Sequence, residues 1–95
     1  MVGGGQGAFI GAVHRIASRI DDRYELLAGA FSSNAEKAIA SGQEIGIDED
    51  RNYKNFNEMI EAESSREDKI DAVAIVTPNH MHHPIAMAFM NKGFN

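Results

Sequence analysis

The first eleven residues read Met1-Val2-Gly3-Gly4-Gly5-Gln6-Gly7-Ala8-Phe9-Ile10-Gly11, a cluster of glycines behind a short apolar start. Apolar side chains then recur at spacings of three and four residues, which is typical of one helix face, at Ile10, Val13, Ala17 and Ile20. Backbone without side chains at a strand-to-helix turn can approach a pyrophosphate closely, and the helix N-terminus offers free N–H groups. The stretch therefore predicts a strand, a phosphate-binding turn and a helix.

Two glycine spacings fit this turn, and both stay open. Gly3 to Ala8 matches the G-x-G-x-x-G/A pattern, whereas Gly5, Gly7 and Gly11 match a longer one. A glycine motif by itself also occurs as a flexible terminus without a ligand, so the rest of the chain has to supply the context.

Apolar segments of strand length alternate with helical patterns along the rest of the chain. Residues 24–31 and 70–77 are mostly apolar, and the second run, which stops at Pro78, is the clearest strand of the sequence. Strands buried on both faces have this composition. The alternation predicts an α/β fold in which helices cover both faces of a parallel sheet.

Two helices are predicted from their first residues. Ser33 and Glu36 have the spacing of a capping box and begin a helix that ends near Gly42. Asn55 caps a short helix with apolar residues on one side, within 56–60.

The remaining segments are predicted from composition. Pro84 suits the first turn of a last helix, which ends at Gly93. The polar residues 42–52 and the charge-rich residues 61–69 are expected to be solvated loops. On the first helix, His14 is expected to be partly buried.

Composition excludes several classes of protein. The chain has 95 residues, of which 43% are hydrophobic and 24% charged, as in one small soluble domain. The net charge of −5 disfavours nucleic acid and membrane partners. Without cysteine there is no disulfide, thiolate zinc site or catalytic thiol, and no apolar run approaches the roughly 20 residues of a membrane helix. A cytoplasmic location is expected.

The choice of cofactor depends on the end of segment 24–31. An Asp or Glu there would accept hydrogen bonds from the ribose hydroxyls of NAD. The sequence instead has Phe31-Ser32-Ser33-Asn34. Serine hydroxyls could donate to a 2′-phosphate, so NADP is at least as plausible as NAD. The favoured interpretation of Ser33 alone is that it caps its helix.

Polar residues also follow the strand at 70–77, in Thr77-Pro78-Asn79-His80-Met81-His82-His83-Pro84. Open parallel sheets bind ligands at the C-terminal ends of their strands. A metal site is disfavoured, because adjacent histidines on a loop rarely converge on one ion and no carboxylate stands beside them. A hydrogen bond from one histidine to backbone at the helix start is favoured instead.

Two motifs together carry a family resemblance: the glycine segment 3–15 and the segment Ala74-Ile75-Val76-Thr77-Pro78-Asn79-His80-Met81-His82. They resemble the family of glucose-fructose oxidoreductase, inositol dehydrogenase and MocA over essentially the whole chain. The resemblance implies that residues 1–95 are a partial, Rossmann-like NAD(P)-binding domain, truncated at both ends. The cofactor-binding residues that it implies are Gly3, Gly5, Gln6, Gly7, Ala8, Phe9, Ser32, Ser33, Thr77, Pro78, Asn79 and His82.

The resemblance also implies a role for each group of residues. The glycines would line the dinucleotide phosphates, Ser32 and Ser33 would lie near the adenosine ribose, and Thr77, Pro78 and Asn79 would border the nicotinamide. His82 would shape the pocket and transfer no proton.

Three departures from the family pattern matter. The glycine turn is longer, the acid after the second strand is missing, and the family's Glu-Lys-Pro-like motif and catalytic sheet domain do not follow Gly93. The resemblance therefore implies the cofactor-binding part of an NAD(P)-dependent oxidoreductase for a sugar, polyol or related hydroxyl compound, without catalytic residues or turnover of its own. A non-catalytic dinucleotide-binding or interaction module is the alternative. An unpaired edge at 70–77 would favour a homo-oligomer.

Overall fold

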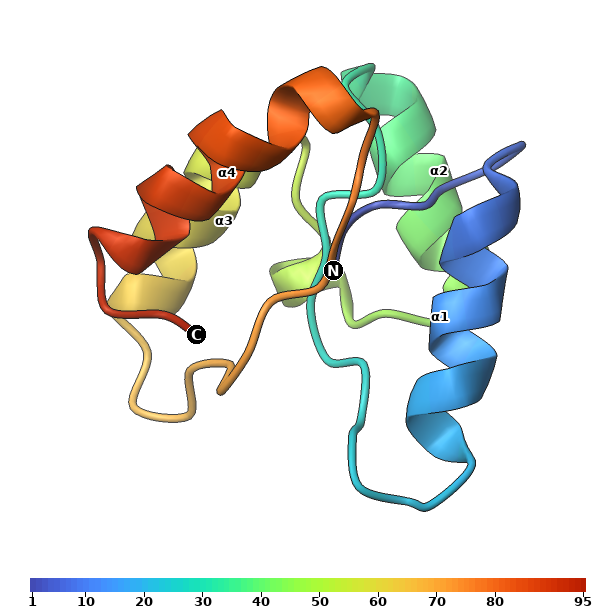
Figure 1. Ribbon diagram of the computed structural model, residues 1–95, viewed down its shortest axis with the longest axis horizontal. Coiled ribbons are helices and arrows are strands. Elements are labelled where there is room, and N and C mark those ends of the chain that lie inside the picture. The colour runs from blue at the N-terminus through green and yellow to red at the C-terminus, as the bar shows by residue number, and fades with distance from the viewer.

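The computed structural model describes residues 1–95 and contains four α-helices and a small parallel sheet (Figure 1). The elements are β1 (Val2–Gly3), α1 (Phe9–Arg19), α2 (Ala35–Ile45), α3 (Phe56–Ser64), β2 (Ile75–Val76) and α4 (His82–Met90), with 3₁₀ turns at Glu49–Arg51 and Asn79–Met81. Figure 1 shows α1 and α2 on one side of the central extended segments and α3 and α4 on the other. The predicted α/β class with helices on both faces is confirmed.

Four extended segments lie side by side at the centre of the molecule. Val2 pairs in parallel with Ile75 of β2, and on its other side it forms a parallel bridge with Ala30. Gly29 in turn forms a parallel bridge with Asn52. The first segment of the chain therefore lies inside the sheet, between the second segment and β2, as expected for a parallel sheet built by helical crossovers.

The predicted strands are longer than the observed ones. Within residues 24–31 only Gly29 and Ala30 form bridges, and within residues 70–77 only β2 is a strand. The neighbouring segment begins at Met1, whose amino group donates to the Ala28 carbonyl at 2.8 Å. Residues 24–27 therefore lie beyond the start of that segment and have no strand partner there. The segment around Asn52, expected to be a loop, supplies an edge of the sheet.

Helix α2 begins and ends at other residues than predicted. Its N-cap is Asn34, whose Oδ1 accepts a hydrogen bond from the Lys37 N–H at 2.9 Å, and Ser33 does not cap it. The helix continues past Gly42 and ends at Gly46, which has a φ of 87°. Gly42 stays helical because its bare backbone packs against the side chain of Asn52, where a Cβ would collide.

The other caps agree with the sequence. Asn55 caps α3 by accepting a hydrogen bond from the Glu58 N–H at 2.9 Å. Pro84 lies in the first turn of α4, and Gly93 follows that helix with a φ of 82°. These predictions are confirmed. Each could be made from the sequence because its signal lies within three or four residues of the helix end.

The hydrophobic core lies between the sheet and the helices α3 and α4. Its residues are Val2, Ala28, Ala30, Tyr53, Met59, Ile60, Ile70, Ile85, Phe89 and Phe94. Burial of these side chains is the main term favouring the fold. None of the helices is long and apolar enough to cross a lipid bilayer.

Helix α1 packs differently, since its apolar stripe faces solvent. Ile10, Val13 and Ile20 of that stripe are 45%, 42% and 76% exposed. The helix contacts the rest of the chain along Gly11, Arg15 and Ser18 instead. His14 is exposed beside that line of contact, so the expectation of partial burial was wrong.

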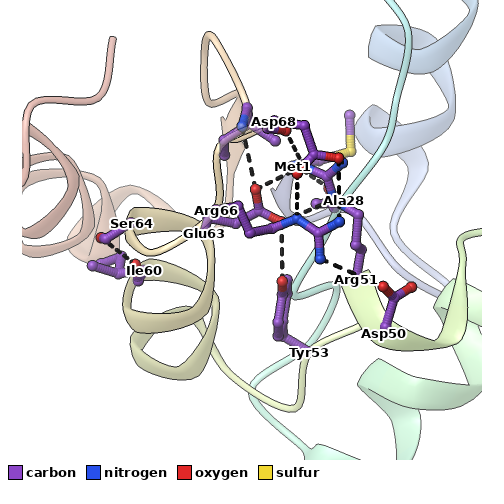
Figure 2. A network of polar contacts seen from close by, with 11 residues as sticks. Met1, Ala28, Asp50, Arg51, Tyr53, Ile60, Glu63, Ser64, Arg66 and Asp68 are labelled. Atoms are coloured by element: carbon purple, nitrogen blue, oxygen red, sulfur yellow. Dashed lines mark hydrogen bonds and ion pairs between the residues drawn. The ribbon is translucent and has the colours of Figure 1, made fainter.

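A buried polar cluster lies beside the core and ties α3 to the segments around it (Figure 2). The Glu63 carboxylate accepts hydrogen bonds from Arg51 Nε at 3.0 Å and Nη2 at 2.7 Å, from the Tyr53 hydroxyl at 3.0 Å and from the Ile70 N–H at 3.2 Å. The expectation of a solvated loop at 61–69 was wrong here, because Glu63 is fully buried and its charge is paired.

The cluster also shifts the pKa values of its members. Burial opposes ionisation of Glu63, but hydrogen bonds from Arg51, Tyr53 and the Ile70 N–H outweigh burial and hold its pKa below the ordinary value. Burial, followed by the hydrogen bond to Glu63, raises the pKa of Tyr53 to about 12. Glu63 is therefore held ionised and Tyr53 neutral.

Candidate cofactor-binding site

The glycine turn joins β1 to α1 and is packed tightly against both helices of its side. A Cβ on Gly11 would collide with the backbone of Gly4, and a Cβ on Gly5 would lie 2.6 Å from the carbonyl oxygen of Phe31. Gly4 also has a φ of 74°, which favours glycine. Side chains at these positions would push α1 and the second segment away from the turn.

Two side chains hold the turn in place. Arg15 of α1 donates from Nη1 to the Gly4 carbonyl at 2.8 Å. Ser41 of α2 accepts a hydrogen bond from the Gln6 N–H at 3.0 Å and donates to the Lys37 carbonyl at 2.7 Å. The turn is therefore fixed by contacts from both α1 and α2.

Several N–H groups of the turn have no acceptor within the chain. They belong to Gly4, Gly7, Phe9 and Ile10. The N-cap of α1 is Ala8, which has no side-chain acceptor, whereas α2 and α3 are capped by asparagines. Unpaired N–H groups at a helix N-terminus favour an anion, so the turn fits the pyrophosphate of a dinucleotide.

A cleft of about 510 Å³ opens beside the turn, along the ends of the central segments. A volume of this size is typical of small-molecule sites. Eight of the predicted residues line it: Gly3, Gly5, Gln6, Ala8, Ser32, Ser33, Thr77 and Pro78. The structure thus brings together the glycine turn, the end of the second segment and the end of β2.

The other four predicted residues lie outside this cleft. Gly7 and Phe9 line a separate hollow of about 340 Å³, between α1 and α2. Asn79 and His82 line neither hollow. Their assignment to the cofactor site stays a prediction.

His82 has a structural contact of its own. Its Nε2 lies 2.8 Å from the carbonyl oxygen of Thr77, across the turn that leads from β2 into α4. The expected hydrogen bond between a histidine and backbone at the start of this helix is confirmed. The contact fixes the turn that carries Thr77 and Pro78 into the cleft.

Sequence reasoning missed several residues of the cleft: Lys37, Asn55, Phe56, His80, Met81 and Ile85. The first of these had a usable signal, because Lys37 lies in the first turn of a helix that follows directly from Ser32 and Ser33. Asn55 and Phe56 had none, because only the fold brings the start of α3 to the same cleft.

The chain is similar to known oxidoreductases. All of residues 1–95 match the family model described as "Oxidoreductase family, NAD-binding Rossmann fold". An uncharacterized oxidoreductase of Bacillus subtilis, YfiI, is 40% identical over 94 residues, which are 98% of this chain and 24% of that protein.

Solved structures are similar along the whole chain. An oxidoreductase from Sinorhizobium meliloti is 58% identical with a TM-score of 0.94, and the match covers 100% of this chain and 26% of that one. An inositol dehydrogenase homolog from Azotobacter vinelandii, solved with NADH and myo-inositol, is 37% identical with a TM-score of 0.95, over 100% of this chain and 25% of that one. The chain thus spans about a quarter of the length of these relatives. The predicted Rossmann-like fold and nicotinamide dinucleotide cofactor are confirmed.

Proposed function

The chain belongs to the Gfo/Idh/MocA family of oxidoreductases, which has an NAD-binding Rossmann fold, and on that premise we propose its role within a whole enzyme. It is the cofactor-binding part of an NAD(P)-dependent oxidoreductase that acts on a sugar, a polyol or a related hydroxyl compound. One observation carries the proposal: the unpaired N–H groups at the start of α1 open beside a cleft that also receives the ends of two neighbouring segments.

The residues of the chain bind and orient the cofactor, and the nicotinamide supplies the hydride chemistry when it is bound. The N–H groups of Gly4 and of the first turn of α1 hold the pyrophosphate. Thr77 and Pro78, at the end of β2, border the nicotinamide half of the cleft. The bond between His82 and the Thr77 carbonyl sets the position of that border.

A polyol substrate is supported by the relatives. The Azotobacter vinelandii homolog was solved with myo-inositol, a polyol. The match covers only 25% of that protein, so residues that select a substrate would lie in the remainder of such an enzyme. We therefore propose cofactor binding without turnover for the 95-residue chain, and clear NAD(P)H production by that chain from any of a panel of sugars and polyols would contradict it.

The binding site is tested by adding a carboxylate at the N-cap of α1. Ala8→Asp would cap the unpaired N–H groups and repel a pyrophosphate, so the helix is kept while the anion site is lost. Calorimetric titration with NAD should show at least a roughly tenfold weaker affinity, since the added carboxylate takes the N–H donors of the pyrophosphate and repels its charge, with no loss of thermal stability.

The matched control is Ala17→Asp, which adds the same charge to α1 more than two turns away from the glycine turn. Its affinity for NAD should equal that of the unaltered chain. Equal affinity of Ala8→Asp and the unaltered chain would contradict a pyrophosphate at the start of α1.

A further inference from the structure

We propose that one face of α1 pairs with the same face of a second copy of this chain, and that the two helices run antiparallel. This outer face of α1 consists of Phe9, Val13, Ile16 and Ile20. The pairing goes beyond the proposed function, because it needs neither a cofactor nor a catalytic domain.

The outer face carries a regular row of large apolar side chains. They follow one another at spacings of four, three and four residues, as in the seam of a coiled coil, where each side chain packs between residues of the facing helix. All four residues are exposed, Phe9 to 82% and Ile16 to 65%. A contiguous apolar surface of this kind on a soluble chain marks an interaction site.

The contacts of α1 with its own chain lie on the opposite side of the helix. Gly11 is buried against the backbone of Gly4, and Ser18 is half-buried. Gly11 and Ile20 are nine residues apart, which is about two and a half helical turns, so they face in opposite directions. Figure 1 shows α1 at the outer edge of the molecule. A second helix can therefore reach the whole outer face without any rearrangement of the fold.

A second copy fits this face because the row is complementary to itself. When two α1 helices run antiparallel about a two-fold axis at the middle of the row, Phe9 packs against Ile20 of the other copy. Val13 packs against Ile16 in the same way. Each residue of the row then has one apolar partner, as a two-fold symmetric interface requires.

The residues beside the row allow the two helices to come close. Ala12 and Ala17 flank it on either side and are exposed, and their small side chains admit the facing helix. In the antiparallel pair Ala17 lies beside Ile10 of the other copy. Ala12 lies beside Arg19, so no two like charges face each other along the seam.

The charges at the ends of α1 favour the antiparallel direction. Asp21 and Asp22 follow the C-cap of α1 and form no ion pair within the chain. Antiparallel pairing brings them to the start of the other α1, which has no side-chain cap and where the Phe9 and Ile10 N–H groups lack an acceptor. Carboxylates are favourable at a helix N-terminus. Parallel pairing would instead place the aspartates of the two copies side by side.

The association is tested by sedimentation velocity, at concentrations up to the millimolar range and without dinucleotide. The face is only three turns long, so its interface lies at the small end of specific interfaces and the dissociation constant should be micromolar or weaker. Ile16→Glu should raise that constant at least roughly tenfold, because it places an unpaired carboxylate in an apolar seam.

Met90→Glu is the matched control, because Met90 of α4 is 63% exposed, nearly as much as Ile16, and lies on another helix. It should associate like the unaltered chain. Thermal unfolding of both variants should match that of the unaltered chain, since neither side chain is buried in it.

The direction of the helices is tested by disulfide formation, which has no background because the chain contains no cysteine. Chains carrying Phe9→Cys are mixed with chains carrying Ile20→Cys in the presence of oxidised glutathione. The two positions are about 16 Å apart along α1, beyond the roughly 7 Å between Cα atoms that a disulfide can span. Antiparallel pairing should therefore give the mixed disulfide, and parallel pairing would join each variant to itself.

Three results would overturn the pairing: a monomer at every concentration, association of Ile16→Glu equal to that of the unaltered chain, or disulfides only between identical variants. A monomer would mean that another occupant, such as the remainder of a longer enzyme, covers the outer face. These results leave the proposed function untouched, which depends on NAD titration. A chain that dimerises as expected but binds no NAD would overturn the proposed function alone.

Discussion

The cluster around Glu63 and the glycine turn use their polar groups in opposite ways. Around Glu63 both carboxylate oxygens accept hydrogen bonds from buried donors on two separate parts of the chain, the segment of Arg51 and Tyr53 and the backbone of Ile70. At the glycine turn the N–H groups of Gly4, Gly7 and Phe9 have no acceptor within the chain. Both regions are rich in polar groups, yet only the second one leaves hydrogen-bonding capacity for a ligand.

The difference separates residues that hold the fold from residues that bind. Arg51, Tyr53 and Glu63 connect the edge segment, α3 and the approach to β2, so they support the frame on which the cleft is built (Figure 2). A perturbed pKa often marks a functional site, but structural ion pairs perturb pKa values too. Here the lowered pKa of Glu63 follows from a network that is complete without a ligand.

The largest expected effect comes from breaking the Glu63 cluster. Glu63→Ala removes the buried partner of the Arg51 guanidinium and leaves it only the exposed Asp68 at 3.6 Å, and breaking a buried pair typically costs about 3–5 kcal/mol of unfolding free energy. A domain of this kind has about 5–15 kcal/mol in total, so the variant should be largely unfolded at modest urea concentrations. Urea unfolding followed by circular dichroism measures the loss.

The control for that variant is Glu61→Ala. Glu61 lies in the same helix but its side chain is 73% exposed, and its pair with Lys92 is on the surface. Exposed pairs contribute about 0–1 kcal/mol. Similar losses of unfolding free energy in the two variants would show that the Glu63 cluster stabilises the fold no more than a surface ion pair does.

An intermediate effect is expected from the glycine turn. Gly11→Ala places a methyl group against the backbone of Gly4, and overpacking of this kind costs about 1–3 kcal/mol. Because the collision moves α1 away from the turn, we expect the affinity for NAD to fall more than the stability does. Calorimetric titration and thermal unfolding of the same preparation separate the two effects.

Gly46→Ala is the matched control for this glycine. Gly46 ends α2 with a φ of 87° and has open space around it, so alanine there is strained without a collision. It should reduce stability by about 1 kcal/mol and leave NAD affinity unchanged. If Gly11→Ala left the affinity for NAD unchanged, close packing of α1 against the glycine turn would not be required for binding.

What the sequence predicted correctly depends on local signals. The glycine turn, the Asn55 cap and Pro84 at the start of α4 each act through neighbouring residues, so their positions could be predicted. The Asn34 cap was missed because Ser33 and Asn34 are adjacent and both residue types are good caps. The structure distinguishes them by the hydrogen bond from the Lys37 N–H to Asn34.

What the sequence could not predict depends on residues far apart in the chain. Arg51 and Glu63 pair across 12 positions, and a charge-rich segment around Glu63 is normally solvated. The strand at 24–31 was predicted too long because apolar composition gives no information on where a neighbouring segment starts. Asn55 and Phe56 line the cleft only because the fold brings the start of α3 to it.

The smallest expected effect, and the most specific one, concerns the proton of Tyr53. Its hydroxyl donates to Glu63 at 3.0 Å, so Tyr53→Phe should cost about 1 kcal/mol at neutral pH. Burial, followed by the hydrogen bond to Glu63 and the charge of Glu63, raises the pKa of Tyr53 from 10.0 in the unfolded chain to about 12 in the folded one. The unfolded chain therefore loses this proton first, and the contribution to stability is complete below pH 10 and declines as the pH rises toward 12.

Removing the hydroxyl should remove that decline. Urea unfolding between pH 8 and pH 12 should give a shallower loss of stability for Tyr53→Phe than for the unaltered chain, so the two curves approach each other as the pH rises. Tyr24→Phe is the control, because Tyr24 is 67% exposed and its curve should run parallel to that of the unaltered chain. Parallel curves for Tyr53→Phe as well would mean that folding does not raise the pKa of Tyr53, which would contradict a buried phenol that donates its proton to Glu63.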